Sequence, residues 1–399
     1  MVNNYYYLRG GAERVLFDDQ AGLEASGHQV LPFTARSDAN RQAPWQELFP
    51  QSYDHGSVRG WNRARAAIAT VYSAEAGRAF AAFLNSAKPE VIHCHNIYGR
   101  LTTAVLDAAR RLGIPVVLTV HDYKIVCPSY LMLRRGMVCD CCTGGGYWRC
   151  LINRCHKTSF SGSLVYSLET YFNRLLGKYD WVSRFLCPSR FLLDMLDRGG
   201  YPTCKLTLHP NSVREEQYQP NSTPGKYVLY AGRLSQEKGL STLLTAFEAS
   251  CIPLKIAGDG PLRQELQRRI EAAPSANIAL LGYQTADVLH RLIREAAFVV
   301  LPSEWYENAP MAVLEAFALG KPVLAARIGG IPELVEDGRN GALFPSGDAP
   351  ALAEAAKRLW ADRPRLEQMG RSAREIVVTR YSHRERTARL LELYREVCA

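Results

Sequence analysis

Two glutamates lie eight residues apart in the segment SEWYENAPMAVLEAFALGKPV, residues 303–323. Residues 310–319 are all apolar except for Glu315, so a helix over this segment is expected to be buried on most sides. A carboxylate in such surroundings costs several kcal/mol unless it has a partner. The partner of Glu315 is therefore either an internal Arg or Lys, or a ligand. The second acid, Glu307, lies just before the apolar run.

The ends of the helix are marked by residues with known preferences. Pro310 suits the first helical position, with Asn308 or Ala309 as the cap. Gly320 suits the left-handed position that follows the last turn.

The distance between the two acids argues against glycoside hydrolysis. On one helix, an eight-residue spacing would separate Glu307 from Glu315 by about 12 Å. The carboxylate pairs of glycoside hydrolases lie roughly 5 to 9.5 Å apart. The spacing therefore favours two polar contacts with one elongated ligand.

Two cations and two glycines could bind an anionic part of that ligand. Arg233 and Lys238 lie in GRLSQEKG, a predicted strand-to-helix loop, and two cations there suit a diphosphate, although a solvated loop is equally consistent. Gly10 and Gly11 in RGGAERV precede a helix that we expect to begin at Ala12 or Glu13. Helix N-termini favour anions.

Alternating strands and helices position these residues. Apolar strands such as EVIHCHN, IPVVLTVHD, KYVLYAGRL, LKIAGDG and FVVLPSE are separated by amphipathic helices, which predicts parallel sheets in an α/β fold. A Pro-, Ser- and Asn-rich linker near residue 213 separates two such series. We therefore expect two doubly wound, Rossmann-like domains, 1–213 and 214–380, and a final helix, 381–399, that packs back toward the first. Ligands bind beyond the carboxyl ends of such strands, where His121 also lies.

The length of the chain and its apolar runs limit the class of protein. At 399 residues two domains are natural, and no apolar run reaches the roughly 18 residues of a membrane span. The N-terminus lacks the apolar core of a signal peptide, so we expect a cytoplasmic protein. Only Met1 and Val2 could form a strand before the glycine loop, which suggests that the sequence begins a few residues late.

The net charge of +9 lies mostly in the first half of the chain. Residues 1–213 contain 24 Lys and Arg against 16 Asp and Glu, an excess of +8. This half is expected to meet an anionic membrane surface, a phosphorylated acceptor or nucleic acid, unless it is simply a solvated basic surface.

Six of the eleven cysteines fall in CPSYLMLRRGMVCDCCTGGGYWRCLINRC, about residues 127–155. Cys139, Cys142, Cys150 and Cys155 have a spacing that can close a structural zinc site. Either Cys127 or Cys141 could replace one of the four. Disulfides or unligated packing cysteines are the alternatives, and a reducing cytoplasm disfavours the disulfides.

The second half of the chain resembles the retaining, GT-B-fold glycosyltransferases of glycosyltransferase family 4, bacterial type. The matching elements are YAGRLSQEKGLSTLLTAF, IAGDGPLRQEL, LGYQ and PSEWYENAPMAVLEAFALGKPVLAARIGGIPELVEDGRNGALF. The last is the most specific. Weaker matches in the first half are GGAERV, HCHN and TVHDY.

The resemblance implies a site made of several parts. Arg233 and Lys238 would bind the donor diphosphate, together with backbone at Gly10 and Gly11. Glu315 would accept hydrogen bonds from ribose hydroxyls. The sugar would contact the side chain of Glu307, the backbone of Asn308, Ala309, Pro310 and Met311, and His121.

The resemblance also implies an activity. The enzyme would move a sugar from a UDP- or GDP-sugar to a polysaccharide, a lipid-linked glycan or another glycan, with retention and without an obligatory metal. Domain 1–213 would lie on the acceptor side, and 214–380 would bind the nucleotide sugar. The enzyme could lie peripherally on the inner face of the membrane.

The sequence departs from the family pattern at three places. The linker reads PNSV where Asn-Gly is usual, Asn308 replaces the common Gly after Glu307, and the opening strand is short.

Two rival functions remain. A sugar-nucleotide epimerase is the rival within the fold. A zinc-bearing nucleic-acid-binding protein is the rival outside it, but we find no RNA-binding signature and expect no nucleic-acid partner.

Overall fold

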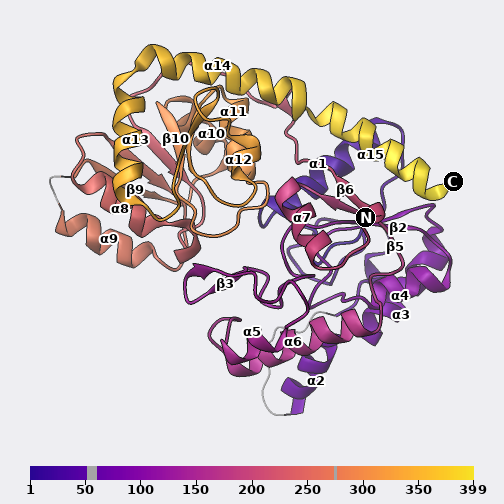
Figure 1. Cartoon of the computed structure of the whole chain (residues 1–399). Helices are drawn as coiled ribbons and strands as arrows, with labels where there is room; N and C mark the ends of the chain where they lie inside the picture. Colours follow the sequence, from indigo (N-terminus) through magenta and orange to yellow (C-terminus); the bar gives the residue numbers. More distant parts are fainter. Residues whose placement is uncertain (52–60, 274–275) are drawn as a thin grey trace. The chain divides into compact units, whose positions relative to one another are not determined.

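The computed structural model describes residues 1–51, 61–273 and 276–399 of the chain (Figure 1). The chain divides into two compact units. Unit 1 comprises 1–135, 139–210 and 386–399, and unit 2 comprises 136–138 and 211–385. The chain passes from unit 1 to unit 2 after residue 210 and back to unit 1 after residue 385. The domain boundaries expected from the sequence are residues 213 and 380.

Unit 1 is built on a parallel four-stranded sheet in the order β1-β2-β5-β6. Its strands are β1 (Ile92–Cys94), β2 (Val116–Thr119), β5 (Val182–Cys187) and β6 (Leu206–Leu208). Val2 adds single parallel bridges to Phe33 and Cys94. The strand before the glycine loop is therefore short, as expected.

Helices surround this sheet, and a two-stranded ribbon interrupts the chain after β2. The helices are α1 (Gly11–Ala25), α2 (Trp61–Val71), α3 (Ala74–Ala87), α4 (Ala104–Arg111), α5 (Trp148–Ile152), α6 (Phe160–Leu175) and α7 (Arg190–Arg198). The ribbon pairs β3 (Leu133–Arg134) with β4 (Met137–Val138). The cysteine-rich segment thus folds into the ribbon, turns and α5.

Unit 2 has a parallel six-stranded sheet in the order β12-β11-β10-β7-β8-β9. Its strands are β7 (Val228–Ala231), β8 (Leu254–Ala257), β9 (Ile278–Gly282), β10 (Phe298–Leu301), β11 (Val323–Ala326) and β12 (Gly341–Phe344). Both faces are buried: Val228 and Tyr230 of β7 pack in one core, Leu229 and Ala231 in the other. Such a two-sided core explains why these strands read as continuous apolar runs.

The helices of unit 2 lie between successive strands, except for the last two, which follow β12. They are η4 (Gln236–Lys238), α8 (Leu240–Glu248), α9 (Arg263–Ala272), α10 (Ala286–Arg294), α11 (Met311–Ala318), α12 (Ile331–Leu334), α13 (Ala349–Ala361) and α14 (Arg363–Arg380). The two parallel α/β units match the fold class expected from the sequence. None of the helices in the described ranges is both long and apolar enough to cross a membrane.

The last helix, α15 (His383–Cys398), enters unit 1 at Arg386. The Arg386 guanidinium donates to both carboxylate oxygens of Asp19, at 2.7 and 2.9 Å. Both side chains are almost fully buried. Further along, the Tyr394 hydroxyl lies 2.6 Å from Nδ1 of His93 in β1. These polar contacts fix α15 to the N-terminal part of the chain.

Candidate active site

Two loops at the carboxyl ends of β7 and β10 meet in unit 2. Gly239 ends the first loop with a left-handed φ of 68°. A Cβ on this glycine would lie 1.9 Å from the carbonyl oxygen of Pro302. No other residue allows this approach, which brings Lys238 beside the loop that contains Glu307.

Lys238 and Glu307 form a hydrogen-bonded ion pair. The Lys238 ammonium donates to Oε1 of Glu307 at 2.7 Å, and the Ser303 hydroxyl donates to the same oxygen at 2.7 Å. Burial opposes ionisation of Glu307, but the nearby ammonium and the hydrogen bonds outweigh it, so the pKa of Glu307 is lowered. Glu307 is therefore a buried carboxylate at neutral pH.

The backbone of Glu307 is also held in place. Its carbonyl oxygen accepts a hydrogen bond from the Gly330 amide at 2.7 Å. Gly329, with a φ of 57°, lies so close that a Cβ would be 2.3 Å from that oxygen. The loop before α12 therefore fixes the position of the carboxylate.

Arg233, in the same loop as Lys238, and Trp305, beside the ammonium, suit an anionic, hydroxyl-rich ligand. Arg233 is exposed, and no partner of its guanidinium is found in the described part of the chain. The Trp305 ring lies 4.9 Å from the Lys238 ammonium. The buried Trp305 N–H contributes to the low pKa of Glu307 but has no partner with normal hydrogen-bond geometry among the described residues. A ligand could accept this bond.

Helix α11 begins at Met311, with Pro310 as its N-cap. The expectation that Pro310 is the first helical residue is therefore wrong by one position, because its extended ψ of 118° places it outside the helix. Val313, Leu314 and three later residues bury the inner face. Glu315 is partly exposed at the edge of that face, so the helix alone does not bury it, and its contact with a ligand stays a prediction.

No side chain caps the N-terminus of α11. Asn308 is nearly buried, and the carbonyl oxygen of Ala309 accepts a hydrogen bond from Asn211 at 3.0 Å. The linker residue Asn211 thus orders the segment that leads into the helix. The amide groups of the first turn remain suited to an anion or a sugar hydroxyl.

In unit 1, His121 follows β2 and contacts a second histidine. Nε2 of His121 lies 2.8 Å from Nδ1 of His95, and the two rings stack at an interplanar angle of 15°. Burial, with the positive charge of Arg386, lowers the pKa of His121 to about 3. His121 is thus a neutral donor or acceptor at neutral pH.

Gly10 and Gly11 lie at the N-terminus of α1. Gly10 is the N-cap, with no side-chain cap, and Gly11 is the first helical residue, one or two positions earlier than expected. Both are exposed. The first turn of α1 can therefore present backbone amides to an anion, with Glu13 also in this turn.

Comparison with known families decides where this arrangement belongs. A family model described as Glycosyltransferase Family 4 matches residues 9–217, more than half of the chain. The chain belongs to glycosyltransferase family 4. A second model, Glycosyl transferases group 1, matches residues 213–376.

Curated relatives of this family 4 chain include two bacterial transferases. Alpha-D-kanosaminyltransferase of Streptomyces kanamyceticus is 31% identical over 189 residues, 46% of this chain and 48% of the relative. Lipopolysaccharide 1,2-N-acetylglucosaminetransferase of Salmonella typhimurium is 29% identical over 247 residues, 56% of this chain and 64% of the relative. The chain thus spans about half the length of the first relative and less than two thirds of the second.

Solved structures share the fold across the whole chain. Sucrose-phosphate synthase from Thermosynechococcus elongatus has a TM-score of 0.72 at 19% identity and covers 99% of this chain and 95% of its own. HepE of Anabaena, in complex with UDP-glucose, has a TM-score of 0.65 at 18% identity, with 99% and 98% covered. These likenesses confirm the GT-B fold that the sequence predicted.

The four cysteines of the predicted zinc site in this family 4 chain do not appear as one compact group of potential ligands among the described residues. Cys142 and Cys150 are buried around Tyr147, with Cys155 packed beside them, while Cys139 is partly exposed. All are free thiols. Hydrogen bonding from Cys155 lowers the pKa of Cys150 to about 7, and burial raises the pKa of Cys142. Zinc binding stays a prediction.

One group of potential metal ligands is compact in the described ranges. Ligand atoms of Asp19, His93 and His95 lie within 4.8 Å of one another. However, Arg386 binds both oxygens of Asp19, while His93 contacts Tyr394 and Thr119 through its two ring nitrogens. A cation would have to displace a buried guanidinium, so this group is a hydrogen-bonded core.

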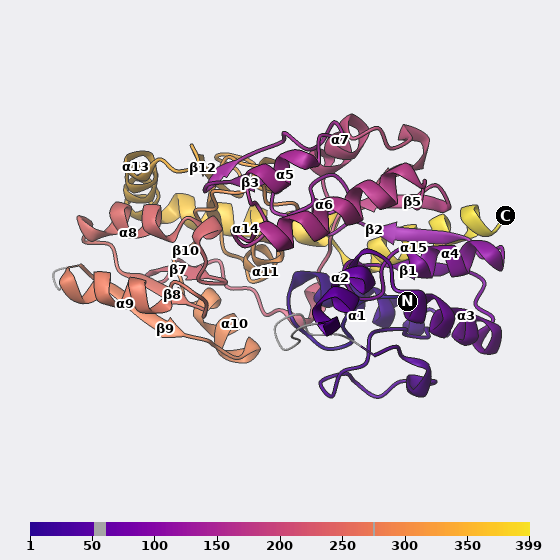
Figure 2. The same cartoon turned by 90° about the horizontal axis from the view of Figure 1, so that it is seen from below.

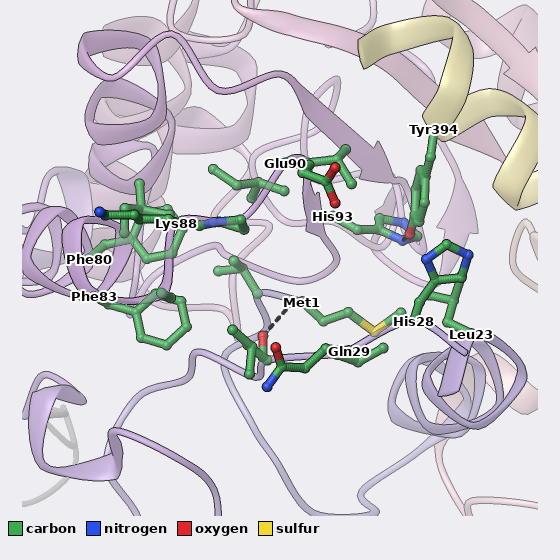
Figure 3. Close-up of a pocket in the computed structure, with 18 residues that line it drawn as sticks. Met1, Leu23, His28, Gln29, Phe80, Phe83, Lys88, Glu90, His93 and Tyr394 are labelled. Carbon is green, nitrogen blue, oxygen red and sulfur yellow. Dashed lines mark hydrogen bonds between the residues drawn. The ribbon is translucent and has the colours of Figure 1, made fainter. Parts of the chain in front are cut away.

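A cavity of about 220 Å³ in unit 1 lies apart from all the predicted site residues. Figure 3 shows Met1, His28, His93 and Tyr394 among its lining residues. The Met1 ammonium donates to the carbonyl oxygen of Leu31 at 2.7 Å, and burial lowers its pKa to about 6.

Sequence reasoning missed three residues that the structure adds to the two sites. Ser303 and Trp305 lie in the same segment as the paired glutamates, directly after β10, where polar residues following a strand could have indicated them. His95 follows β1 in the HCHN motif.

Proposed function

We propose that this protein transfers a sugar from a nucleotide-diphosphate donor to a glycan acceptor, with retention of anomeric configuration. The observation on which the proposal rests is the Lys238–Glu307 ion pair, with its buried carboxylate and with Trp305 beside the ammonium. Membership of family 4 and the transferase names of the relatives support it. The relatives do not favour the epimerase alternative.

The cations would stabilise the departing nucleotide diphosphate. An ammonium has three donors, and Lys238 uses one of them on Glu307, which leaves two for phosphate oxygens. The exposed Arg233 guanidinium can form a bidentate contact with the same group. Donors that are already positioned lower the barrier when negative charge develops on the leaving group.

Glu307 would orient the donor sugar. Lys238 and Ser303 both bond to Oε1, so Oε2 can accept hydroxyl groups of the sugar. Hydrogen-bond donors nearby are the Trp305 N–H and the amides of the first turn of α11, which begins at Met311. Asn308, Ala309 and Pro310 lead into this turn, and their backbone would line the sugar site. Glu315 would bind the ribose.

Unit 1 would supply His121 to the transferred sugar and the Gly10–Gly11 amides to the diphosphate. His121 is neutral, so it would act by hydrogen bonding and not by charge. The proposed acceptor is a polysaccharide, lipid-linked or other glycan. No catalytic metal is part of this proposal, because the two cations can neutralise the leaving group.

The test is incubation with a panel of UDP- and GDP-sugars, with and without glycan acceptors. We expect release of UDP or GDP that requires an acceptor, and a product with the anomeric configuration of the donor by NMR. Formation of an epimer without acceptor would support the epimerase. An inverted product would disprove retention.

A further inference from the structure

Helix α6 is amphipathic in the reverse of the usual sense. Its buried residues are polar: Ser163, Ser167, Glu169, Thr170 and Asn173. Its exposed residues include Phe160, Leu164, Leu168 and Leu175, at 54%, 36%, 52% and 79% exposure. A surface helix of a water-soluble protein normally places these two kinds of residue the other way round.

The buried polar face is fully used inside unit 1. Glu169 pairs with Lys124, which is also buried. Asn173 accepts a hydrogen bond from Thr103 of the turn before α4 at 2.7 Å. Ser167 donates to the carbonyl oxygen of Tyr147 at 3.1 Å. These bonds fix the rotation of α6, so the apolar stripe cannot turn inward.

The stripe continues on the neighbouring helix. Helix α5 packs against α6 in both views (Figures 1 and 2) and exposes Trp148 and Ile152, at 52% and 67%. We call this surface the α5–α6 face. It consists of Trp148, Ile152, Phe160, Leu164, Leu168 and Leu175. A cluster of large exposed apolar side chains on adjacent helices marks an interaction surface.

Exposed basic side chains lie in the segment that joins and includes the two helices, although Lys178 near its end is paired with Asp107 and the exposed Asp180 follows it. Residues 144–179 contain the basic residues Arg149, Arg154, Lys157, Arg174 and Lys178. The one acidic residue in this range of the sequence is Glu169, which is buried and paired with Lys124. Arg149, Arg154 and Lys157 are exposed.

We propose that the α5–α6 face docks on an anionic lipid surface. Leu and Phe on one side of a helix, a tryptophan beside them and flanking basic residues are the combination that binds at a membrane interface. A second copy of the chain would bring two basic faces together, which disfavours self-association through this face. The proposal is independent of the sugar transfer proposed above.

The test is flotation of the full chain with vesicles. We expect binding to phosphatidylcholine vesicles that contain phosphatidylglycerol, weaker binding at high salt, and little binding to phosphatidylcholine alone. The double variant Leu164→Gln/Leu168→Gln should lower the partition coefficient roughly tenfold or more. The double variant Arg154→Gln/Lys157→Gln should lower it by about fivefold per residue.

Matched control variants distinguish binding through this face from non-specific binding of exposed apolar residues to the vesicles. Leu112 and Val378 are exposed to 43% and 47%, outside the face. The double variant Leu112→Gln/Val378→Gln should therefore float like the unchanged protein. Circular dichroism must show the same fold for every variant, and the single variant Leu168→Gln replaces the double variant if the latter unfolds.

Several results would overturn the proposal. The unchanged protein could fail to float with either vesicle, or the Leu164/Leu168 variant could float as well as the control. A dimer in lipid-free light scattering that becomes monomeric in the same variant would assign the face to a second copy. None of these measurements depends on enzymatic activity.

Discussion

At the scale of single residues, the site depends on how one buried carboxylate keeps its charge. Glu307 is removed from water, and this alone would favour its protonated form. The Lys238 ammonium and the Ser303 hydroxyl reverse that preference through two short hydrogen bonds to one oxygen. The other oxygen can then accept bonds from a ligand as an anion.

The first prediction separates the roles of the two glutamates. Glu307→Gln removes the charge that holds Lys238 and should reduce turnover about 100-fold or more. Glu315→Gln should chiefly weaken nucleotide binding, because its proposed partner is the ribose. Turnover of donor and calorimetric titration with the free nucleotide measure these effects. Wild-type rates in both variants would contradict the site assignment.

The second prediction concerns pH. The pKa of His121 is lowered to about 3, well below the usual value for histidine, so its ring stays neutral over the whole physiological range. His121→Ala should therefore reduce the transfer rate by the same factor from about pH 5.5 to pH 8. The measurement is the ratio of wild-type to variant rates across that range. A ratio that changes with an inflection near pH 6.5 would show that the ring titrates.

At the scale of elements, the alternation of strands and helices was predictable because buried parallel strands are continuous apolar runs. The strands β1, β2, β7, β8 and β10 all fall within the predicted segments. The polar residues after β10 were predictable as a site for the same reason. The Lys238–Glu307 contact was not, since it depends on how two loops 69 residues apart approach each other.

The reversed helix α6 was also beyond sequence reasoning. Its pattern gives the helical period but not which side faces inward, and the inner side is decided by Lys124 and Thr103, which lie elsewhere in the chain. Similarly, the exposure of Glu315 depends on its place at the edge of α11. The repeat of apolar and polar residues along the sequence therefore predicts which elements form better than it predicts which side of each element faces inward.

The third prediction tests the approach of the two loops. Gly239→Ala should lower the free energy of unfolding by more than about 3 kcal/mol, because a left-handed conformation and a clash with Pro302 add together. Gly347 has a similar φ of 78° with no atom within 4 Å of a Cβ. Gly347→Ala should therefore cost only about 1 kcal/mol. Urea unfolding of both variants provides the comparison, and equal losses would count against the clash.

The fourth prediction concerns the cysteine-rich segment. If Cys139, Cys142, Cys150 and Cys155 bind structural zinc, the purified protein should contain one zinc per chain. The double variant Cys142→Ser/Cys150→Ser should lose it, and Cys251→Ser, an exposed cysteine elsewhere, should retain it. Elemental analysis measures the metal. Less than one zinc per chain, with full activity in chelator, would rule out the site.

At the scale of the whole molecule, unit 1 is made from segments that are far apart in the sequence. All strands of its sheet come from the part of the sequence before residue 210. Helix α15 adds Arg386 and Tyr394 from the other end of the chain. The sequence predicted that the last helix packs toward the first domain. It could not predict the anchor, because Asp19 and Arg386 are 367 positions apart.

The fifth prediction tests this anchor. Arg386→Met leaves the buried Asp19 carboxylate without its partner and should destabilise the protein by about 3–5 kcal/mol. Arg389→Met changes an exposed arginine on the same helix and should have little effect. Thermal and urea unfolding measure both. The double variant Asp19→Leu/Arg386→Met should recover part of the loss, and no recovery would argue against an unpaired charge as the cause.

The anchor also has a consequence for biosynthesis. A ribosome makes residues 1–210 first, then residues 211–385 of unit 2, and only then the arginine that neutralises Asp19. While unit 2 is being made, the nascent first unit contains an uncompensated interior acid and lacks the tyrosine that bonds to His93. Its final consolidation must therefore follow translation of α15, so the N-terminal unit is expected to stay open to chaperones and proteases until synthesis is almost over.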